Sequence, residues 1–275
     1  MPQEFRIFGP PGTGKTTELA TRDIPRAVER FGPDKVLVCS FTRAAAKEIS
    51  GRGLEVDEDH VGTLHALAYR VLGKPVLVEG HISEWNEAHP ALRLSGALKQ
   101  DMDEGGDEQD TSATVADDFY ARSQIYRARL TPEIMWNSEA KGFHLLWTKW
   151  KKENSYLDFT DLIEEGLKWY PKHPADPRVI FADEAQDFTP LELKLIRQWG
   201  EAADWIVLAG DDDQTIYNFT GASPRAFLNP QLPEGHERVL NHSYRISAHG
   251  RNKLNRFISL IYIQSRKEKY YTSSD

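Results

Sequence analysis

Short apolar runs that end in glycine or acidic residues recur along this chain, and they predict the strands of a parallel sheet. FRIF at 5–8 is a short strand candidate, and continuous apolar runs follow as VIFA at 179–182 and IVLA at 206–209. Apolar runs without polar alternation are typical of strands that are buried on both faces. We therefore expect an α/β fold in which helices flank a parallel sheet.

The first run leads into GPPGTGKT at 9–16, which fits the phosphate-loop pattern G-x-x-x-x-G-K-[ST]. In such a loop, glycines leave backbone N–H groups free to point at phosphate oxygens. Lys15 would reach the β and γ phosphates of a nucleoside triphosphate, and Thr16 would hold magnesium. TELA at 17–20 can continue as a helix whose N-terminal dipole favours phosphate. The alternative is a glycine-rich turn without a ligand. The residues predicted to bind the nucleotide in this segment are Gly12, Thr13, Gly14, Lys15, Thr16 and Thr17.

Acidic residues follow the second run, and a glutamine follows the third. Asp183 and Glu184 would lie at the carboxyl end of a strand, where open α/β sheets bind their ligands. Asp183 is placed to hold magnesium, and Glu184 to orient and deprotonate the attacking water. The alternative for such an acidic pair is a helix N-cap. Gln214 is a candidate sensor of the γ phosphate.

Taken together, these segments resemble the UvrD/Rep-like DNA helicases of superfamily one. Further segments occur in the family's order: VLVCSFTRAAAKEI at 36–49, VGTLHALAYR at 61–70, LDFTDLI at 157–163, GDDDQTIYNFTGA at 210–222 and LNHSYRIS at 240–247. The resemblance implies an ATP-binding motor half with a RecA-like phosphate-loop core. It also implies ATP with Mg²⁺, single-stranded DNA as partner and movement in the 3′ to 5′ direction.

The resemblance also implies residues that contact DNA and residues that contact the adenine and the γ phosphate from a second domain. Aromatic rings would stack on bases and polar groups would meet the backbone, although core packing is the commoner role for any single aromatic. The DNA-contact candidates are Phe41, Thr42, Arg43, Thr63, His65, Tyr217 and Phe219. Tyr244 matches the residue that stacks on adenine, and Arg245 the one that reaches the γ phosphate from a second motor domain.

The resemblance also divides the chain. Residues 1–72 and 156–240 would form the motor core, 73–155 an inserted helical subdomain, and 241–275 the start of an incomplete second motor domain. The residues after Arg245 contain nothing like the family's last two helicase motifs, so we expect half a motor, either truncated or completed by another polypeptide. In the insert, Phe143, Leu146, Trp147 and Trp150 recur at helical spacing. They predict either a packed helix face or a basic, aromatic DNA surface.

Net charge of −8 argues at first against a nucleic-acid partner. Residues 101–118 hold eight acidic and no basic side chains, so the remaining chain balances at 34 basic against 34 acidic residues (42 minus 8). A solvated acidic loop explains this segment. Cys39 is the single cysteine and reads as a core residue, and we expect no structural metal. This cysteine usage fits a reducing cytoplasm, where we expect the protein. No apolar stretch approaches the roughly 18 residues that span a membrane.

The sequence therefore leaves three functions open. The leading one is the ATP-binding half of a DNA helicase. The second is a split or degenerate half that binds nucleotide or single-stranded DNA without efficient turnover and acts through a partner. The third is an unrelated phosphate-loop enzyme such as a kinase or GTPase, but the guanine-reading NKxD segment is missing from the sequence.

Overall fold

The computed structural model describes most of the chain, and its secondary structure follows the apolar runs. The described residues are 2–10, 12–41, 43, 46–47, 51, 53, 55–95, 114–214, 221–244 and 272–273. The main sheet has the order β3-β2-β4-β5-β1-β6, and every pair is parallel. Its strands are β1 (Gln3–Phe8), β2 (Val36–Ser40), β3 (Val61–Thr63), β4 (Val179–Asp183), β5 (Trp205–Gly210) and β6 (Glu237–Val239). The predicted α/β class and the three predicted strands are confirmed.

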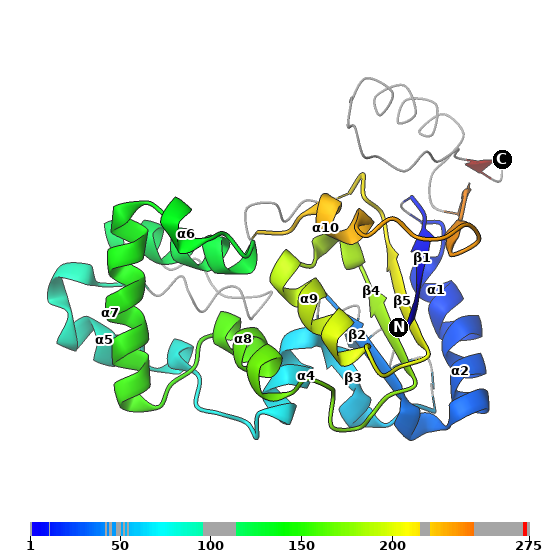
Figure 1. The fold of residues 1–275 in the computed structure, drawn as a ribbon, viewed down its shortest axis with the longest axis horizontal. Helices are drawn as coiled ribbons and strands as arrows, with labels where there is room; N and C mark the ends of the chain where they lie inside the picture. Colours follow the sequence, from blue (N-terminus) through cyan, green and yellow to red (C-terminus); the bar gives the residue numbers. More distant parts are fainter. Residues whose placement is uncertain are drawn as a thin grey trace.

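Helices cover both faces of the sheet (Figure 1). On one face lie α1 (Lys15–Glu18), the π-helical turn η1 (Leu19–Asp23) and α2 (Ile24–Phe31). On the other face lie α4 (Leu64–Val71), α8 (Phe159–Trp169) and α9 (Pro190–Trp199). All five residues of β2 and all five of β4 are buried, which explains why their sequences are apolar without alternation.

The first long helix is interrupted because Pro25 stands at its centre. Proline has no backbone N–H, so the carbonyl four residues earlier loses its normal helical donor. The chain accommodates this by widening into η1 before α2 begins. The helix that the sequence predicts after the phosphate loop is therefore present but is continuous only through this wider turn.

The segment between α4 and α8 builds a separate core around Trp85, which is fully buried. Phe143, Trp147 and Trp150 surround it, with ring centroids 4.9 to 5.6 Å from that of Trp85. Their predicted packing is confirmed, whereas Leu146 is 44% exposed and does not belong to this face. The helices of this segment are α5 (Ile82–Ala88), α6 (Val115–Ala128) and α7 (Ser138–Asn154).

The sequence predicts a solvated loop over the acidic stretch 101–118, but part of this stretch is helical. Residues 101–113 lie outside the described part of the chain, but Asp117 and Asp118 belong to the first turn of α6. Thr114 and Asp117 form a reciprocal capping box at the start of that helix. Acidic residues are favoured there because they complement the helix dipole.

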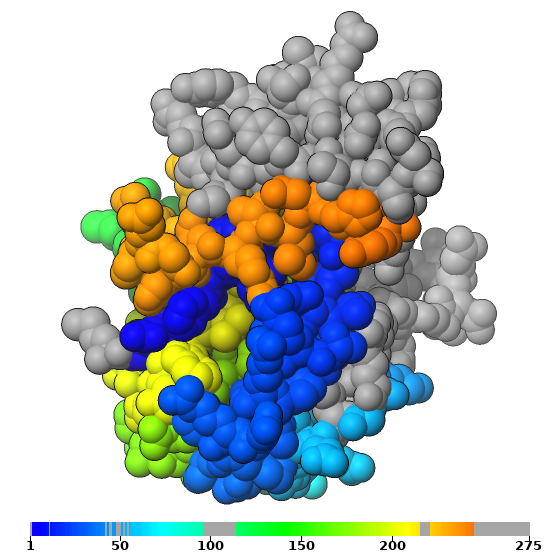
Figure 2. Space-filling model, turned by 90° about the vertical axis from the view of Figure 1, so that its right-hand side faces the viewer, coloured from blue at the N-terminus to red at the C-terminus, as the bar shows by residue number. Residues whose placement is uncertain are grey.

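Smaller elements complete the fold. The 3₁₀ turns are η2 (Pro33–Lys35), η3 (Glu58–His60), η4 (Val78–Gly80), η5 (Pro90–Leu92), η7 (Glu133–Met135) and η8 (Ala185–Asp187). The remaining elements are α10 (Pro224–Leu228), β7 (His242–Ser243) and β8 (Thr272–Ser273). In Figure 2, residues 221–244, in orange, lie across the upper end of the blue N-terminal segment.

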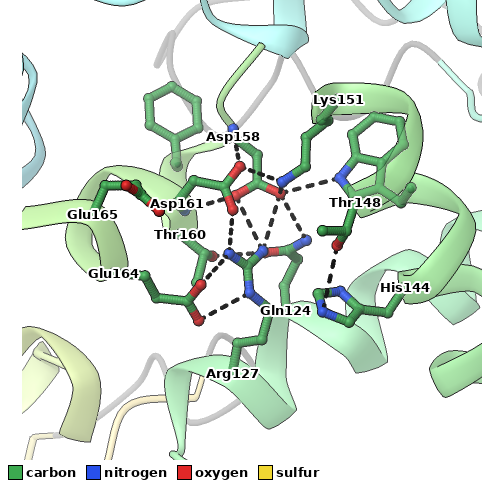
Figure 3. A network of polar contacts seen from close by, with 12 residues as sticks. Gln124, Arg127, His144, Thr148, Lys151, Asp158, Thr160, Asp161, Glu164 and Glu165 are labelled. Atoms are coloured by element: carbon green, nitrogen blue, oxygen red, sulfur yellow. Dashed lines mark hydrogen bonds and ion pairs between the residues drawn. The ribbon is translucent and has the colours of Figure 1, made fainter. Parts of the chain in front are cut away.

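A buried ionic cluster fastens the helical segment to the sheet-bearing core (Figure 3). The Arg127 guanidinium, from α6, lies 3.0 Å from an oxygen of Asp158 and 2.7 Å from one of Glu164. The Lys151 ammonium, from α7, lies 2.5 Å from Asp158 and also contacts Asp161. Lys151 is therefore buried although lysine side chains are mostly exposed. Burial alone would raise the pKa of Asp158, but the charges of Arg127 and Lys151 outweigh burial and hold that pKa well below its usual range.

The chain segments that enter and leave the helical part also lie side by side. Val78 N–H donates to the Leu157 carbonyl at 2.9 Å, and Leu157 N–H donates to the Val76 carbonyl at 3.0 Å. These bonds pair the entering and returning chains immediately before the ionic cluster. The helical segment is thus attached by a backbone bridge and by buried charges.

Replacing Arg127 with alanine should lower the free energy of unfolding by about 3–5 kcal/mol, because buried carboxylates lose their shared cation. Urea denaturation followed by tryptophan fluorescence measures this change. The matched control is Arg122→Ala on the same helix, whose guanidinium pairs with Asp118 at the surface. That control should leave the free energy of unfolding nearly unchanged, because an exposed ion pair contributes little stability. Equal effects of the two substitutions would contradict the structural role given to the cluster.

Candidate phosphate and metal site

The phosphate-loop segment runs from the end of β1 into α1 and closes tightly on itself. Gly12 and Gly14 have φ angles of 73° and 81°, a left-handed region that glycine adopts without strain. The Thr13 hydroxyl donates to the Pro10 carbonyl at 2.8 Å, and Lys15 Nζ donates to the Gly9 carbonyl at 2.7 Å. The lysine is 8% exposed, so its charge is held inside the loop. The described part of the loop thus folds back on itself and holds one ammonium group against its own backbone.

The parallel sheet brings this loop to the acidic end of β4. Thr16 Oγ1 donates to Asp183 Oδ2 at 2.6 Å, although the two residues are 167 positions apart. Asp183 is fully buried, and burial followed by the charge of Glu184 raises the pKa of Asp183 to about 6, while the Thr16 hydroxyl opposes this shift. A hydroxyl and a carboxylate in contact are hard oxygen donors of the kind that Mg²⁺ accepts. A divalent cation there would favour the ionised carboxylate. The donor set therefore fits magnesium.

Glu184 follows with an unusual backbone conformation. Its φ and ψ angles are 53° and 41°, a left-handed conformation that is uncommon for a residue with a side chain. Its N–H donates to Asp183 Oδ1 at 3.0 Å. Although Glu184 precedes the 3₁₀ turn η8, its side chain makes no capping hydrogen bond to the described residues of that turn. The simple capping explanation for the acidic pair is thus not supported, because the Glu184 carboxylate accepts from the Gln186 side chain rather than from the backbone of the turn.

The segment after β5 meets the same site. Gln214 N–H donates to the Asp211 carbonyl at 2.9 Å, and the Gln214 side-chain amide donates to the Asp211 carboxylate. Asp211 is fully buried at the end of β5, which is hydrogen-bonded to both β1 and β4. The structure therefore groups Lys15, Thr16, Asp183, Glu184 and Gln214 on the ends of three adjacent strands.

The predicted adenine side is only partly described. Tyr244 N–H donates to the Gly12 carbonyl at 2.9 Å, so the backbone beyond β7 contacts the phosphate loop. The Tyr244 side chain is 74% exposed and packs edge-on against His242. Thr17 lies on the exposed side of α1, where its carbonyl accepts a hydrogen bond from Thr21. Arg245 lies outside the described residues.

The DNA-contact candidates follow the neighbouring strands β2 and β3. Ser40 pairs with Asp183 on one side and with Thr63 on the other, so Phe41 and Thr63 lie at the same edge of the sheet as the phosphate site. Phe41 is half-buried and packs edge-on against Phe188. Arg43 is exposed. Thr42, Tyr217 and Phe219 lie outside the described residues.

Two of these candidates already have structural partners. The Thr63 hydroxyl accepts from Ala66 N–H at 3.2 Å and thereby caps α4. His65 Nδ1 lies 3.6 Å from Glu192 Oε1, and its ring packs edge-on against Phe159. The helix cap and the carboxylate contact were not anticipated from the sequence. Both residues nevertheless remain at the sheet edge that carries the phosphate site.

A sequence model of the UvrD/REP helicase N-terminal domain matches residues 2–232. The chain belongs to this family. The matched range contains the phosphate loop, the acidic end of β4 and the segment after β5, which are the three parts of the candidate site.

Curated relatives of this family member extend well beyond it. The putative ATP-dependent DNA helicase YjcD of Bacillus subtilis is 26% identical over 245 residues, which cover 80% of this chain and 31% of that relative. The ATP-dependent DNA helicase UvrD2 of Mycobacterium bovis is 25% identical, with 90% and 40% covered. The ATP-dependent DNA helicase PcrA of Bacillus subtilis is 24% identical, with 85% and 34% covered. The chain thus spans between about a third and two fifths of the length of these relatives.

Two absences concern only the residues that the structure describes. Within the ranges given above, no three His, Cys, Asp or Glu side chains cluster in a way that could hold a metal ion. None of the helices in the same ranges is long and apolar enough to cross a membrane.

The site of this UvrD/REP family member also contains a buried glutamine that the sequence does not single out. Gln186 is 3% exposed and lies between the end of β4 and the end of β5. It is part of the DEAQD segment that carries the resemblance, but only the fold shows which strand end it contacts.

The tight fit at the end of β5 gives a stability prediction. A Cβ atom on Gly210 would lie 2.6 Å from Gln186 Oε1 and 3.1 Å from the Gln186 backbone nitrogen. Gly210→Ala should therefore lower the free energy of unfolding by about 1–3 kcal/mol. Gly142→Ala is the control, because a Cβ there meets no described atom within 4 Å and the residue lies inside α7. The control should raise stability by about 0.5–1 kcal/mol. Chemical denaturation that shows no difference between the two variants would contradict the packing described at β5.

Proposed function

We propose that this chain is the ATP-binding half of a DNA helicase or translocase motor, which hydrolyses ATP with Mg²⁺ and binds single-stranded DNA. The observation that carries the proposal is the direct contact between Thr16 of the phosphate loop and Asp183 of β4. This contact places a hydroxyl, a carboxylate and the Lys15 ammonium around one sheet edge. Family membership, and relatives whose names describe ATP-dependent DNA helicases, support the same activity.

Each residue of the site has a distinct chemical role in this proposal. Gly12, Gly14 and the start of α1 would direct N–H groups at the phosphates, and Lys15 would neutralise their negative charge. Thr16 and Asp183 would hold magnesium, which offsets charge on the phosphate oxygens when bound. Glu184 would orient a water molecule and accept its proton. Gln214 would donate to the γ phosphate and respond to its loss.

The motor proposal also assigns domains and a second nucleotide surface. Residues 1–72 and 156–240 form the motor core, 73–155 the helical insert and 241–275 the start of a second motor domain. Tyr244 would stack on adenine, and Arg245 would reach the γ phosphate when the second domain closes. Such closure would couple hydrolysis to movement along DNA in the 3′ to 5′ direction. The remainder of the second domain would come from further chain or from a partner polypeptide.

Single-stranded DNA would cross the edge formed by the ends of β2 and β3. Phe41 is half-buried, so part of its ring is accessible for stacking on a base. Arg43 is exposed beside it and can meet the backbone phosphate. Thr42, Thr63 and His65 complete this edge in the proposal, and Tyr217 and Phe219 supply further stacking.

Two substitutions separate nucleotide binding from hydrolysis. Lys15→Ala should abolish tight ATP binding, because the phosphate charge loses its nearest cation. Glu184→Gln should retain ATP binding and stop turnover, since the amide cannot accept the proton from water. Binding of a fluorescent ATP analogue and release of phosphate measure the two effects. Hydrolysis by Glu184→Gln at the unmodified rate would remove Glu184 from its proposed role.

Phe41→Ala should weaken binding of single-stranded DNA by about 1–3 kcal/mol without changing ATP affinity, because one stacking surface is lost. Fluorescence anisotropy of a labelled oligothymidine measures DNA affinity. Phe31→Ala is the control, because Phe31 is also half-buried but packs on Trp205, on the α2 side of the sheet. A matching loss of DNA affinity in the control, or a parallel loss of ATP affinity in Phe41→Ala, would indicate a packing role for Phe41.

A further inference from the structure

The buried amide of Gln186 connects two parts of the candidate site that come from different strands. Its Nε2 atom donates to Glu184 Oε2 at 3.0 Å and to Asp187 Oδ2 at 3.0 Å. Its Oε1 atom accepts from Asp211 N–H at 2.9 Å. These contacts fix the orientation of the amide, because the reverse orientation would place its oxygen against two carboxylates.

The surrounding backbone leaves little room for another arrangement. Gln186 lies against the glycine that ends β5, where a Cβ atom would approach the Gln186 oxygen to 2.6 Å. The same position would bring that Cβ atom within 3.1 Å of the Phe227 ring. The amide is therefore held between the backbone of β5 and the turn that follows β4.

The contacts continue from Gln186 to the predicted phosphate sensor. Asp211 donates its backbone N–H to Gln186 and receives the side-chain amide of Gln214 on its carboxylate. A continuous set of hydrogen bonds thus runs from Glu184 through Gln186 and Asp211 to Gln214. Its two ends are the residues proposed to activate water and to contact the γ phosphate.

We infer that Gln186 is a positioning residue that holds the Glu184 carboxylate at a fixed position relative to the Asp211–Gln214 turn. The inference rests on the proposed ATPase function and adds the side chain that connects its water-activating and phosphate-sensing parts. The Glu184 side chain, which precedes η8 from a left-handed backbone conformation, has several accessible rotamers. One donor hydrogen of the Gln186 amide selects one of these rotamers, while the other donates to Asp187 and holds the amide in place. Misplacement of a reacting group by about 1 Å can reduce a rate by about 10²-fold. Gln186 acts through Glu184 and makes its contribution to the rate of hydrolysis rather than to nucleotide affinity.

Gln186→Met separates positioning from packing, because methionine nearly preserves the volume but supplies no amide. The variant should hydrolyse ATP about 10- to 100-fold more slowly than the unmodified chain. Its affinity for the ATP analogue should stay within about threefold, since Lys15 and the phosphate loop are unchanged. Gln186→Ala should show a similar rate loss, so restoring volume should not restore turnover.

The matched control is Gln198→Met on α9. The Gln198 amide donates to the carbonyls of Leu167 and Tyr170, away from the phosphate site. Its turnover should remain within about twofold of the unmodified chain. All proteins are assayed with Mg²⁺, ATP and single-stranded oligothymidine, below the unfolding transition of each variant.

A second readout does not depend on turnover. Hydrogen exchange at the Asp211 amide should accelerate at least tenfold in Gln186→Met and stay unchanged in Gln198→Met. Unmodified turnover in Gln186→Met, equal rate losses in the two methionine variants, or unchanged exchange at Asp211 would each overturn the inference. An unmodified chain that neither binds nor hydrolyses ATP better than Lys15→Ala would instead overturn the proposed function, and the Asp211 exchange would still decide whether Gln186 makes this contact.

Discussion

The parallel pairing of β4 with β5 and of β5 with β1 is the constraint on which the whole site depends. Parallel neighbours cannot be joined by tight turns, so each connection returns through a helix or a longer crossing. All strand ends of one polarity consequently meet at the same edge of the sheet. The phosphate loop, the acidic pair and the Asp211 turn follow β1, β4 and β5 at that edge. The contact between Thr16 and Asp183 is the direct chemical result of this pairing.

The helical insert depends on a different interaction. Its aromatic core is self-contained, but its attachment to the sheet-bearing core uses charges from α6, α7 and α8. Burying such charges is costly unless each finds a partner, and the Arg127 and Lys151 side chains both do. Asp158 is its centre: it is fully buried, it caps α8, and it contacts both cations. LDFTDLI is therefore a docking segment as well as the start of a helix.

The sequence was informative where local chemistry determines structure. Continuous apolar runs marked β1, β4 and β5, and the glycine spacing marked the phosphate loop, because both signals lie within a few residues. The sequence could not show contacts that the fold alone creates. Gln186 contacts Asp211, 25 positions away in sequence. Lys151 points into the buried ionic cluster, although the other lysines near it on α7 give no sequence signal that sets it apart. Leu146 is adjacent in sequence to buried Trp147, yet it lies on the exposed side because one helical step rotates a side chain by roughly 100°.

The measurement that tests the central claim most directly is ATP hydrolysis by the purified, unmodified chain in Mg²⁺, with and without single-stranded oligothymidine. We predict turnover above that of Lys15→Ala and an increase when the oligonucleotide is added, because the proposed DNA contacts lie at the same end of the sheet as the phosphate site. Turnover equal to that of Lys15→Ala under both conditions, with the chain folded, would contradict the assignment of this sheet edge as a working ATPase site.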